Sequence, residues 1–146
     1  MPPLDPAEAI PPPPRVLLIM PEQWPRALLR AALREVGYDA LGAPGLAGAL
    51  RYRVQAPSRG PVRLVLVDQA ALQGDEALAL LTTLLHRYGN PAAILLARAV
   101  AMSAPPEQAK PAPWTRVLRR PVSIDGIVAA VRELLPLPPG RSRPLD

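Results

Sequence analysis

The sequence of 146 residues contains no cysteine and a single histidine, His86. Without cysteine the chain has no disulfides, no thiolate zinc site and no cysteine nucleophile. One histidine leaves little for histidine-based catalysis, and a solvated position on a helix explains His86 better than a metal or proton-relay role. A chain without thiols fits a reducing compartment, and we expect a cytoplasmic location.

Long apolar runs are also missing. The longest ones are short and are interrupted by Arg, Asp or Pro, and the first residues lack the basic start and the apolar segment of a signal peptide. We therefore expect no contact with a membrane and no Sec-type export. Hydrophobic residues nevertheless make up 49% of the chain, which is enough to bury the core of one ordinary domain.

Aromatic residues make up only 3% of a chain whose net charge is +5. All but one of the 17 basic residues are arginine, a bias that we attribute to genome composition more than to a partner. A nucleic-acid surface combines clustered charge with stacking aromatics or a recognised reading element. Only Tyr52 stands among the arginines at positions 51, 53, 59 and 63, so direct binding of nucleic acid is disfavoured.

Proline is abundant and unevenly distributed. Eleven of the 22 prolines lie in residues 1–14 and 136–146. Because proline lacks the amide donor and fixes its φ angle, these segments are interpreted as extended tails, Pro-rich at the N-terminus and Pro/Arg-rich at the C-terminus. A proline-rich ligand for a partner is the alternative. Residues 15–135 are then the domain.

Within residues 15–135 the apolar period alternates between that of buried strands and that of helices. The first helix places Leu28 and Leu29 on an apolar stripe and Arg26 and Arg34 on the polar side. Residues 76–86 carry Leu78 and Leu81 at helical spacing in the same way. The alternation predicts an α/β fold, a doubly wound five-stranded parallel sheet with helices on both faces. The predicted strands are 15–20, 38–41, 64–67, 92–97 and 115–119, and the predicted helices are 25–36, 46–52, 76–86 and 123–135.

The segment between the last two strands departs from this alternation. It contains Pro105, Pro106, Pro111 and Pro113 within nine residues. Proline removes a helical hydrogen bond and clashes with the preceding turn. We therefore expect the fourth helix of the fold to be shortened or lost.

Three motifs in this order resemble the response regulator receiver domain of the chemotaxis type. They are Arg15-Val-Leu-Leu-Ile with Gly37-Tyr38, Leu64-Val-Leu-Val-Asp68 with Asp75 seven residues later, and Leu118-Arg119-Arg120-Pro121-Val122-Ser123. The resemblance covers residues 15–135. It implies the flavodoxin-like receiver fold, a role in two-component signal transduction, and Asp68 at the phosphoacceptor position.

The chain departs from the family where the family binds magnesium. The two adjacent acidic residues that hold Mg²⁺ in receivers correspond to Met20 and Pro21, which have no oxygen side chain. Mg²⁺ prefers hard oxygen ligands in octahedral geometry. Glu22, at the next position, is the candidate substitute, but we expect Mg²⁺ binding to be lost and no other cofactor to be bound.

The remaining pocket positions also differ. The family's hydroxyl residue corresponds to Ala97, with Arg98 beside it on the same rim, and its lysine corresponds to Arg120. The switch aromatic corresponds to Val117. The bond before Pro121 is cis in the family, and we expect the same here, since the tertiary amide before proline makes the cis form accessible.

Three roles remain open for Asp68: phosphoacceptor, salt-bridge partner of Arg120, and cap at a strand end. The favoured hypothesis is a pseudo-receiver, a receiver-like module that is not an enzyme and acts by protein–protein interaction without Mg²⁺-dependent phosphorylation. The alternative is a functional phosphoacceptor in a His-Asp phosphorelay, which uses Asp68 with Glu22 and Arg120.

The expected partner is a protein: a histidine kinase, an output protein, or a second copy of the chain in a homodimer. In the family, the fourth helix, fifth strand and last helix form the usual contact surface. That surface makes Trp114, Arg116, Val128 and Arg132 the interface candidates. For Trp114 and Trp24, covering an edge of the core is the favoured interpretation over anchoring an interface.

Overall fold

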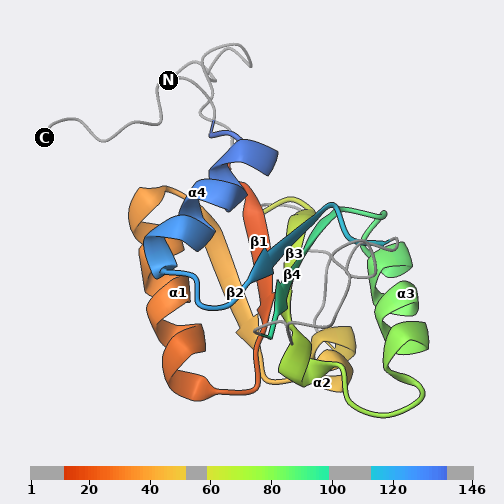
Figure 1. Ribbon diagram of the computed structural model, residues 1–146. Helices are drawn as coiled ribbons and strands as arrows, with labels where there is room; N and C mark the ends of the chain where they lie inside the picture. The colour runs from red at the N-terminus through yellow and green to blue at the C-terminus, as the bar shows by residue number, and fades with distance from the viewer. Residues whose placement is uncertain (1–11, 52–58, 99–112, 138–146) are drawn as a thin grey trace, which may run out of the picture.

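The computed structural model describes residues 12–51, 59–98 and 113–137. Five parallel strands form one sheet in the order β2-β1-β3-β4-β5 (Figure 1). This confirms the doubly wound α/β fold. In chain order the elements are β1 (Arg15–Ile19), α1 (Gln23–Val36), β2 (Asp39–Ala43), α2 (Leu46–Arg51), β3 (Val62–Asp68), a 3-10 turn (Gln69–Ala71), α3 (Ala77–Arg87), β4 (Ala92–Ala97), β5 (Arg116–Arg119) and α4 (Ile124–Leu134).

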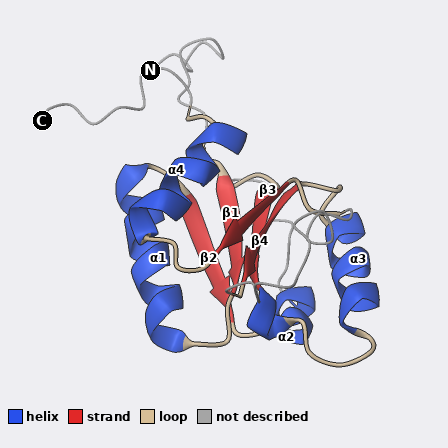
Figure 2. Cartoon of the chain, viewed as in Figure 1, coloured by secondary structure: helices blue, strands red, loops and turns tan. Residues whose placement is uncertain are grey.

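The helices lie in two layers, α1 with α4 on one side of the sheet and α2 with α3 on the other (Figure 2). All five residues of β1 are buried, because successive side chains point to opposite faces and both faces are covered. Leu18 packs with Leu29 and Leu33 of α1, whereas Leu17 packs with Leu81 of α3. The continuous apolar run in the sequence reflects this double burial.

Two leucines differ from the sequence prediction. Leu28 and Leu78 are exposed, although the helical period assigned both to apolar stripes. In α1 the side chains that face the sheet are Leu29 and Leu33, and Leu28 lies about 100° around the helix axis from Leu29. Leu78 lies in the first turn of α3, at the flank of its buried side. The helical period therefore identifies each helix correctly but predicts a wider buried face than the structure has.

The amino-terminal edge of the sheet holds a cluster of charged side chains. Asp39 Oδ2 lies 3.2 Å from Nε of the buried Arg15 and 3.3 Å from Nε of Arg59. Arg15 also donates from Nη1 to the Gly60 carbonyl oxygen at 3.2 Å. One carboxylate thus compensates two guanidinium groups, and the cluster ties the first residues of β1 and β2 to the segment before β3.

Several expectations fall outside the described residues. The segment expected to lack a regular fourth helix includes residues 99–112, and the two tails include residues 1–11 and 138–146. None of these ranges is described. Within the described residues, no helix has the length and apolar character needed to cross a membrane.

Candidate functional site

The carboxyl ends of the parallel strands meet at one edge of the sheet, and Asp68 lies there as the last residue of β3. Register places Ile19 of β1 beside Val67, and Leu96 of β4 beside Asp68. The residues that follow β1, β4 and β5 are therefore gathered around Asp68. This edge is where open α/β sheets place their functional groups.

Both carboxylate oxygens of Asp68 accept hydrogen bonds. Oδ1 accepts from the Ala70 backbone N–H at 2.9 Å, which caps the 3-10 turn. Oδ2 accepts from Nη2 of Arg120 at 2.5 Å. The Asp68 side chain is only 6% exposed, and a buried carboxylate needs such partners because removing its charge from water is costly. Two of the three roles left open by the sequence, ion-pair partner and cap, thus occur together.

Arg120 reaches Asp68 from the far side of β4. Its backbone N–H donates to the Ala97 carbonyl oxygen at 3.0 Å, which extends the pairing of β5 with β4 by one residue. The Arg120–Pro121 peptide bond is cis, as expected. The Arg120 side chain is 40% exposed, so the pair has one buried and one partly solvated member.

A second contact joins the loop after Asp68 to the end of β4. The Arg98 backbone N–H donates to Oε1 of Gln69 at 2.7 Å. Ala97, the position of the family's hydroxyl residue, is buried. Gln69 was not among the residues predicted from the sequence, although its place directly after Asp68 was the available signal. Asp68 and Gln69 therefore fix the same loop to two different parts of the sheet edge.

The end of β1 holds no carboxylate against Asp68. Met20 is buried, and its carbonyl oxygen accepts from Nη1 of Arg26 at 2.6 Å. Glu22 is exposed at the start of α1, where its side chain makes no capping bond. Across the described residues no ion pair or side-chain hydrogen bond of Glu22 is found. The structure does not bring Glu22 together with Asp68.

Arg26 corrects the expectation that the arginines of this helix form one solvated stripe. Its side chain is half-buried and turns back onto the sheet edge across Gly42 of β2. A Cβ at Gly42 would lie 3.0 Å from Cδ of Arg26. The glycine thus leaves the space through which the arginine reaches Met20, and a guanidinium lies close to the position where receivers place acidic residues.

These residues do not fit the magnesium site that the receiver resemblance implies. Both oxygens of Asp68 already accept hydrogen bonds, and the side chains of Met20 and Pro21 offer no oxygen. In the part of the chain that the structure describes, no group of three or more His, Cys, Asp and Glu side chains is placed to hold a metal ion. A hard, octahedral cation needs a richer set of oxygen donors than this edge provides.

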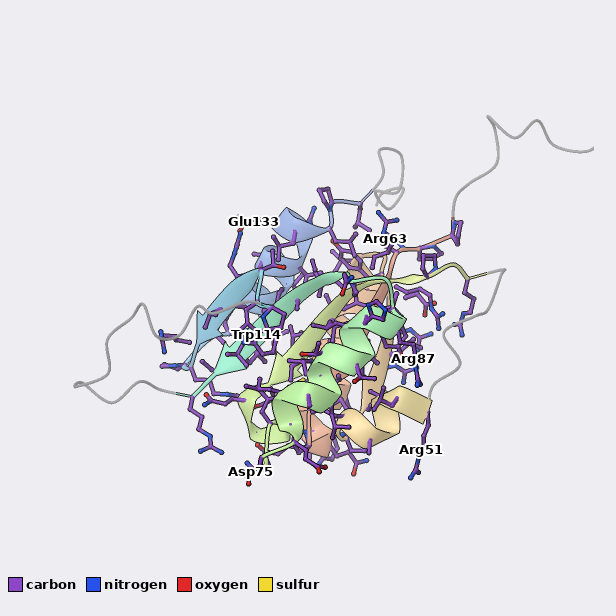
Figure 3. All side chains as sticks on the ribbon, turned by 90° about the vertical axis from the view of Figure 1, so that its right-hand side faces the viewer. Arg51, Arg63, Asp75, Arg87, Trp114 and Glu133 are labelled. Carbon is purple, nitrogen blue, oxygen red and sulfur yellow. The ribbon has the colours of Figure 1, made fainter. Side chains whose placement is uncertain are left out.

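The structure places the four interface candidates on both sides of the sheet. Trp114 is half-buried and packs against the apolar cluster on the α2 and α3 side of the sheet (Figure 3). Val128 packs against the cluster on the opposite side. Arg116 forms an ion pair with Glu133, 3.4 Å between Nη1 and Oε2, and Arg132 is exposed on α4. The geometry agrees with the interpretation that Trp114 covers an edge of the core. The same interpretation is wrong for Trp24, which is exposed and packs in neither core cluster.

No protein-family model matches the sequence, and no curated protein matches it. Solved structures do match. A response regulator from Thermotoga maritima superposes with a TM-score of 0.64 at 19% identity, over 84% of this chain and 97% of that one. The fold is that of a receiver domain. A response regulator receiver protein from Pseudomonas putida gives a TM-score of 0.61 at 22% identity, over 85% of this chain and 99% of that one.

A receiver domain protein from Methanospirillum hungatei gives a TM-score of 0.63 at 16% identity and is covered over 92% of its length. These TM-scores establish the receiver fold. At such low sequence identities, the chemistry has to be argued from the residues of this chain. On the receiver fold Asp68 takes the place at the end of β3, with Arg120 and Gln69 as its immediate surroundings.

Proposed function

We propose that this chain is a pseudo-receiver, which takes part in signal transduction through protein–protein contact and without Mg²⁺-dependent phosphorylation. The observation that carries the proposal is the state of Asp68. Its two oxygens are bound by the Ala70 N–H and the Arg120 guanidinium. The ion pair occupies the carboxylate that would otherwise serve as nucleophile, so the domain keeps one conformation instead of switching.

The energetics of phosphoryl transfer support the same conclusion. Transfer to a carboxylate depends on positioning and on neutralising the charge of the transferred group. Losing one preorganised electrostatic partner costs about 3 kcal/mol, roughly a hundredfold in rate. Here Met20 and Pro21 replace the acidic pair, and Ala97 replaces the hydroxyl. With several such groups lost together, the rate of phosphoryl transfer becomes too low to support signalling, and the chain is not an enzyme.

The partner in this proposal is a protein: a histidine kinase, an output protein or a second copy of the chain. The solved structures that match this chain include response regulators and receiver domains, which supports a partner from a signalling system.

The direct test is the intact mass of the protein after incubation with Mg²⁺ and acetyl phosphate. The Asp68→Asn variant is the matched control, and an ordinary receiver domain in the same tube shows that the reagent is active. We expect no mass gain in either form of this chain. A gain of one phosphoryl group that is absent in Asp68→Asn would refute the pseudo-receiver. It would restore the phosphorelay alternative, with Glu22 recruited to the metal.

A further inference from the structure

Helix α1 presents exposed apolar side chains along its outer face. Trp24 is 77% exposed and Leu28 is 53% exposed. Ala31 and Glu35 continue the same line and are exposed as well. The spacing of four, three and four residues places the four side chains on one side of the helix. We call Trp24, Leu28, Ala31 and Glu35 the α1 stripe.

Folding of the monomer does not require the α1 stripe. The core contacts of the helix come from Leu29 and Leu33, on its other side. Figure 1 shows α1 at the outside of its layer, with α4 beside it. Single exposed apolar residues are ordinary, but a tryptophan one turn from a leucine forms a continuous patch. Tryptophan is also among the residues most enriched in the hot spots of protein interfaces, the few residues that contribute most of the binding energy.

We propose that the α1 stripe is the contact between two copies of this chain, packed antiparallel about a two-fold axis that passes between the two α1 helices, level with their midpoints. This inference deepens the proposed interaction function, because it identifies the partner as a second copy. It rests on that function only for its biological meaning, since the contact itself involves neither Asp68 nor Arg120.

The α1 stripe is complementary to itself in this orientation. The antiparallel alignment sets Leu28 opposite Ala31 of the second copy, so that a large side chain meets a small one twice. Small residues opposite large ones let two helices approach to the usual 8–10 Å. A two-fold interface must be self-complementary in this way, because every contact between two residues occurs twice, once from each copy.

The polar ends of the α1 stripe select the same orientation. Trp24 comes opposite Glu35 of the second copy, so the indole N–H donates to a carboxylate. Among the described residues neither side chain has a hydrogen bond or an ion pair of its own. An indole N–H has only a donor to offer, and it finds an acceptor when it is buried. A parallel pair would instead set Glu35 against Glu35, two like charges.

The test is sedimentation velocity of the full chain at concentrations up to about 1 mM, the range that detects weak dimers. We expect a concentration-dependent monomer–dimer equilibrium. Trp24→Ala is expected to raise the dimer dissociation constant at least tenfold. Leu78→Ala is the matched control, because Leu78 is 60% exposed on α3, on the other side of the sheet, and it should leave the constant unchanged.

The absence of cysteine allows a clean test of orientation. A mixture of the Leu28→Cys and Ala31→Cys proteins is expected to form a mixed disulfide under mild oxidation. A parallel pair would instead cross-link Leu28→Cys with itself, and that result would overturn the proposed packing.

The two proposals fail separately. A wild-type chain that stays monomeric at all concentrations would refute the α1 contact. So would a dimer that is insensitive to Trp24→Ala. Neither result affects the pseudo-receiver proposal, which is tested by the intact mass of the wild-type protein after incubation with Mg²⁺ and acetyl phosphate. All four substitutions, at Trp24, Leu28, Ala31 and Leu78, change exposed side chains. A far-UV circular dichroism spectrum shows that each variant is folded before the measurement.

Discussion

Removal of Arg120 is expected to cost more stability than removal of Asp68, because the two members of the pair are buried to different extents. Arg120→Met leaves the buried Asp68 carboxylate with the Ala70 N–H as its hydrogen-bond donor. Asp68→Ala leaves a guanidinium that is already partly solvated and can turn toward water. The charge that stays buried is the costly one.

The magnitudes follow from burial. Breaking a fully buried ion pair by removing one partner costs about 3–5 kcal/mol. Solvent screens the exposed part of Arg120, which lowers the expected loss for Arg120→Met to about 2–3 kcal/mol. Asp68→Ala removes the cap of the 3-10 turn, at about 1 kcal/mol, together with the pair. We therefore expect its loss to be smaller than that of Arg120→Met by about 1 kcal/mol.

The assay is urea unfolding followed by far-UV circular dichroism, with the double variant completing a mutant cycle. A coupling free energy of about 1–2 kcal/mol is expected between directly bonded partners. Arg98→Met is the matched control, because Arg98 lies on the same rim and its side chain has no hydrogen bond or ion pair with any described residue, whereas its backbone N–H is bonded to Gln69. Its effect should stay within about 0.5 kcal/mol. Strictly additive losses for Asp68 and Arg120 would refute the reasoning.

Three further changes test other parts of the fold. Burial raises the pKa of Tyr38 above its usual 10.0, against the opposing effect of a nearby arginine. The unfolded chain therefore ionises first, and the free energy of unfolding should fall as pH rises above 10. Tyr38→Phe should reduce this alkaline loss in melting curves recorded at different pH values. The same variant also loses the hydrogen bond to the Leu135 carbonyl oxygen, which should lower the free energy of unfolding by about 1 kcal/mol. Asp39→Ala removes the carboxylate beside the buried Arg15 and should cost about 3–5 kcal/mol in urea unfolding, and a loss below about 1 kcal/mol would contradict this account. Ser123→Ala removes the oxygen that caps α4 and should lower the free energy of unfolding by about 1 kcal/mol. Ser123→Asp keeps a capping oxygen and should retain most of the wild-type stability, as measured by calorimetry.

Most of the fold could be predicted from the sequence because both faces of the sheet are covered. Continuous apolar runs are then obligatory in the strands, and the predicted fourth strand coincides with β4 (Ala92–Ala97). Helix α4 (Ile124–Leu134) begins directly after the capping residue Ser123, whose oxygen accepts from the Gly126 N–H. Local chemistry of this kind, a cap or an apolar run, can be read without knowledge of the tertiary structure.

The candidate site could be predicted only in part. Asp68 and Arg120 are 52 positions apart, and their pairing was inferred from the family resemblance, since neither residue has a local signal for the other. Gln69 and Arg26 were missed for a physical reason. Both have long polar side chains that bond backbone atoms just beyond the end of a strand, Met20 after β1 and Arg98 after β4, and no local pattern in the sequence signals such a contact.

A receiver with a fixed pocket and an exposed helix face has a different means of control from one that switches. A ligand shifts a conformational equilibrium only by its differential affinity for the two states. Under the pseudo-receiver proposal, Asp68 stays bound to Arg120 and Gln69 stays bound to the Arg98 backbone, so an input has no second state of the pocket to select. Association through the α1 stripe responds instead to mass action, since dimerisation depends on the concentration of the chain. Under the pseudo-receiver proposal, the amount of protein, or a competitor for Trp24 and Leu28, sets the output.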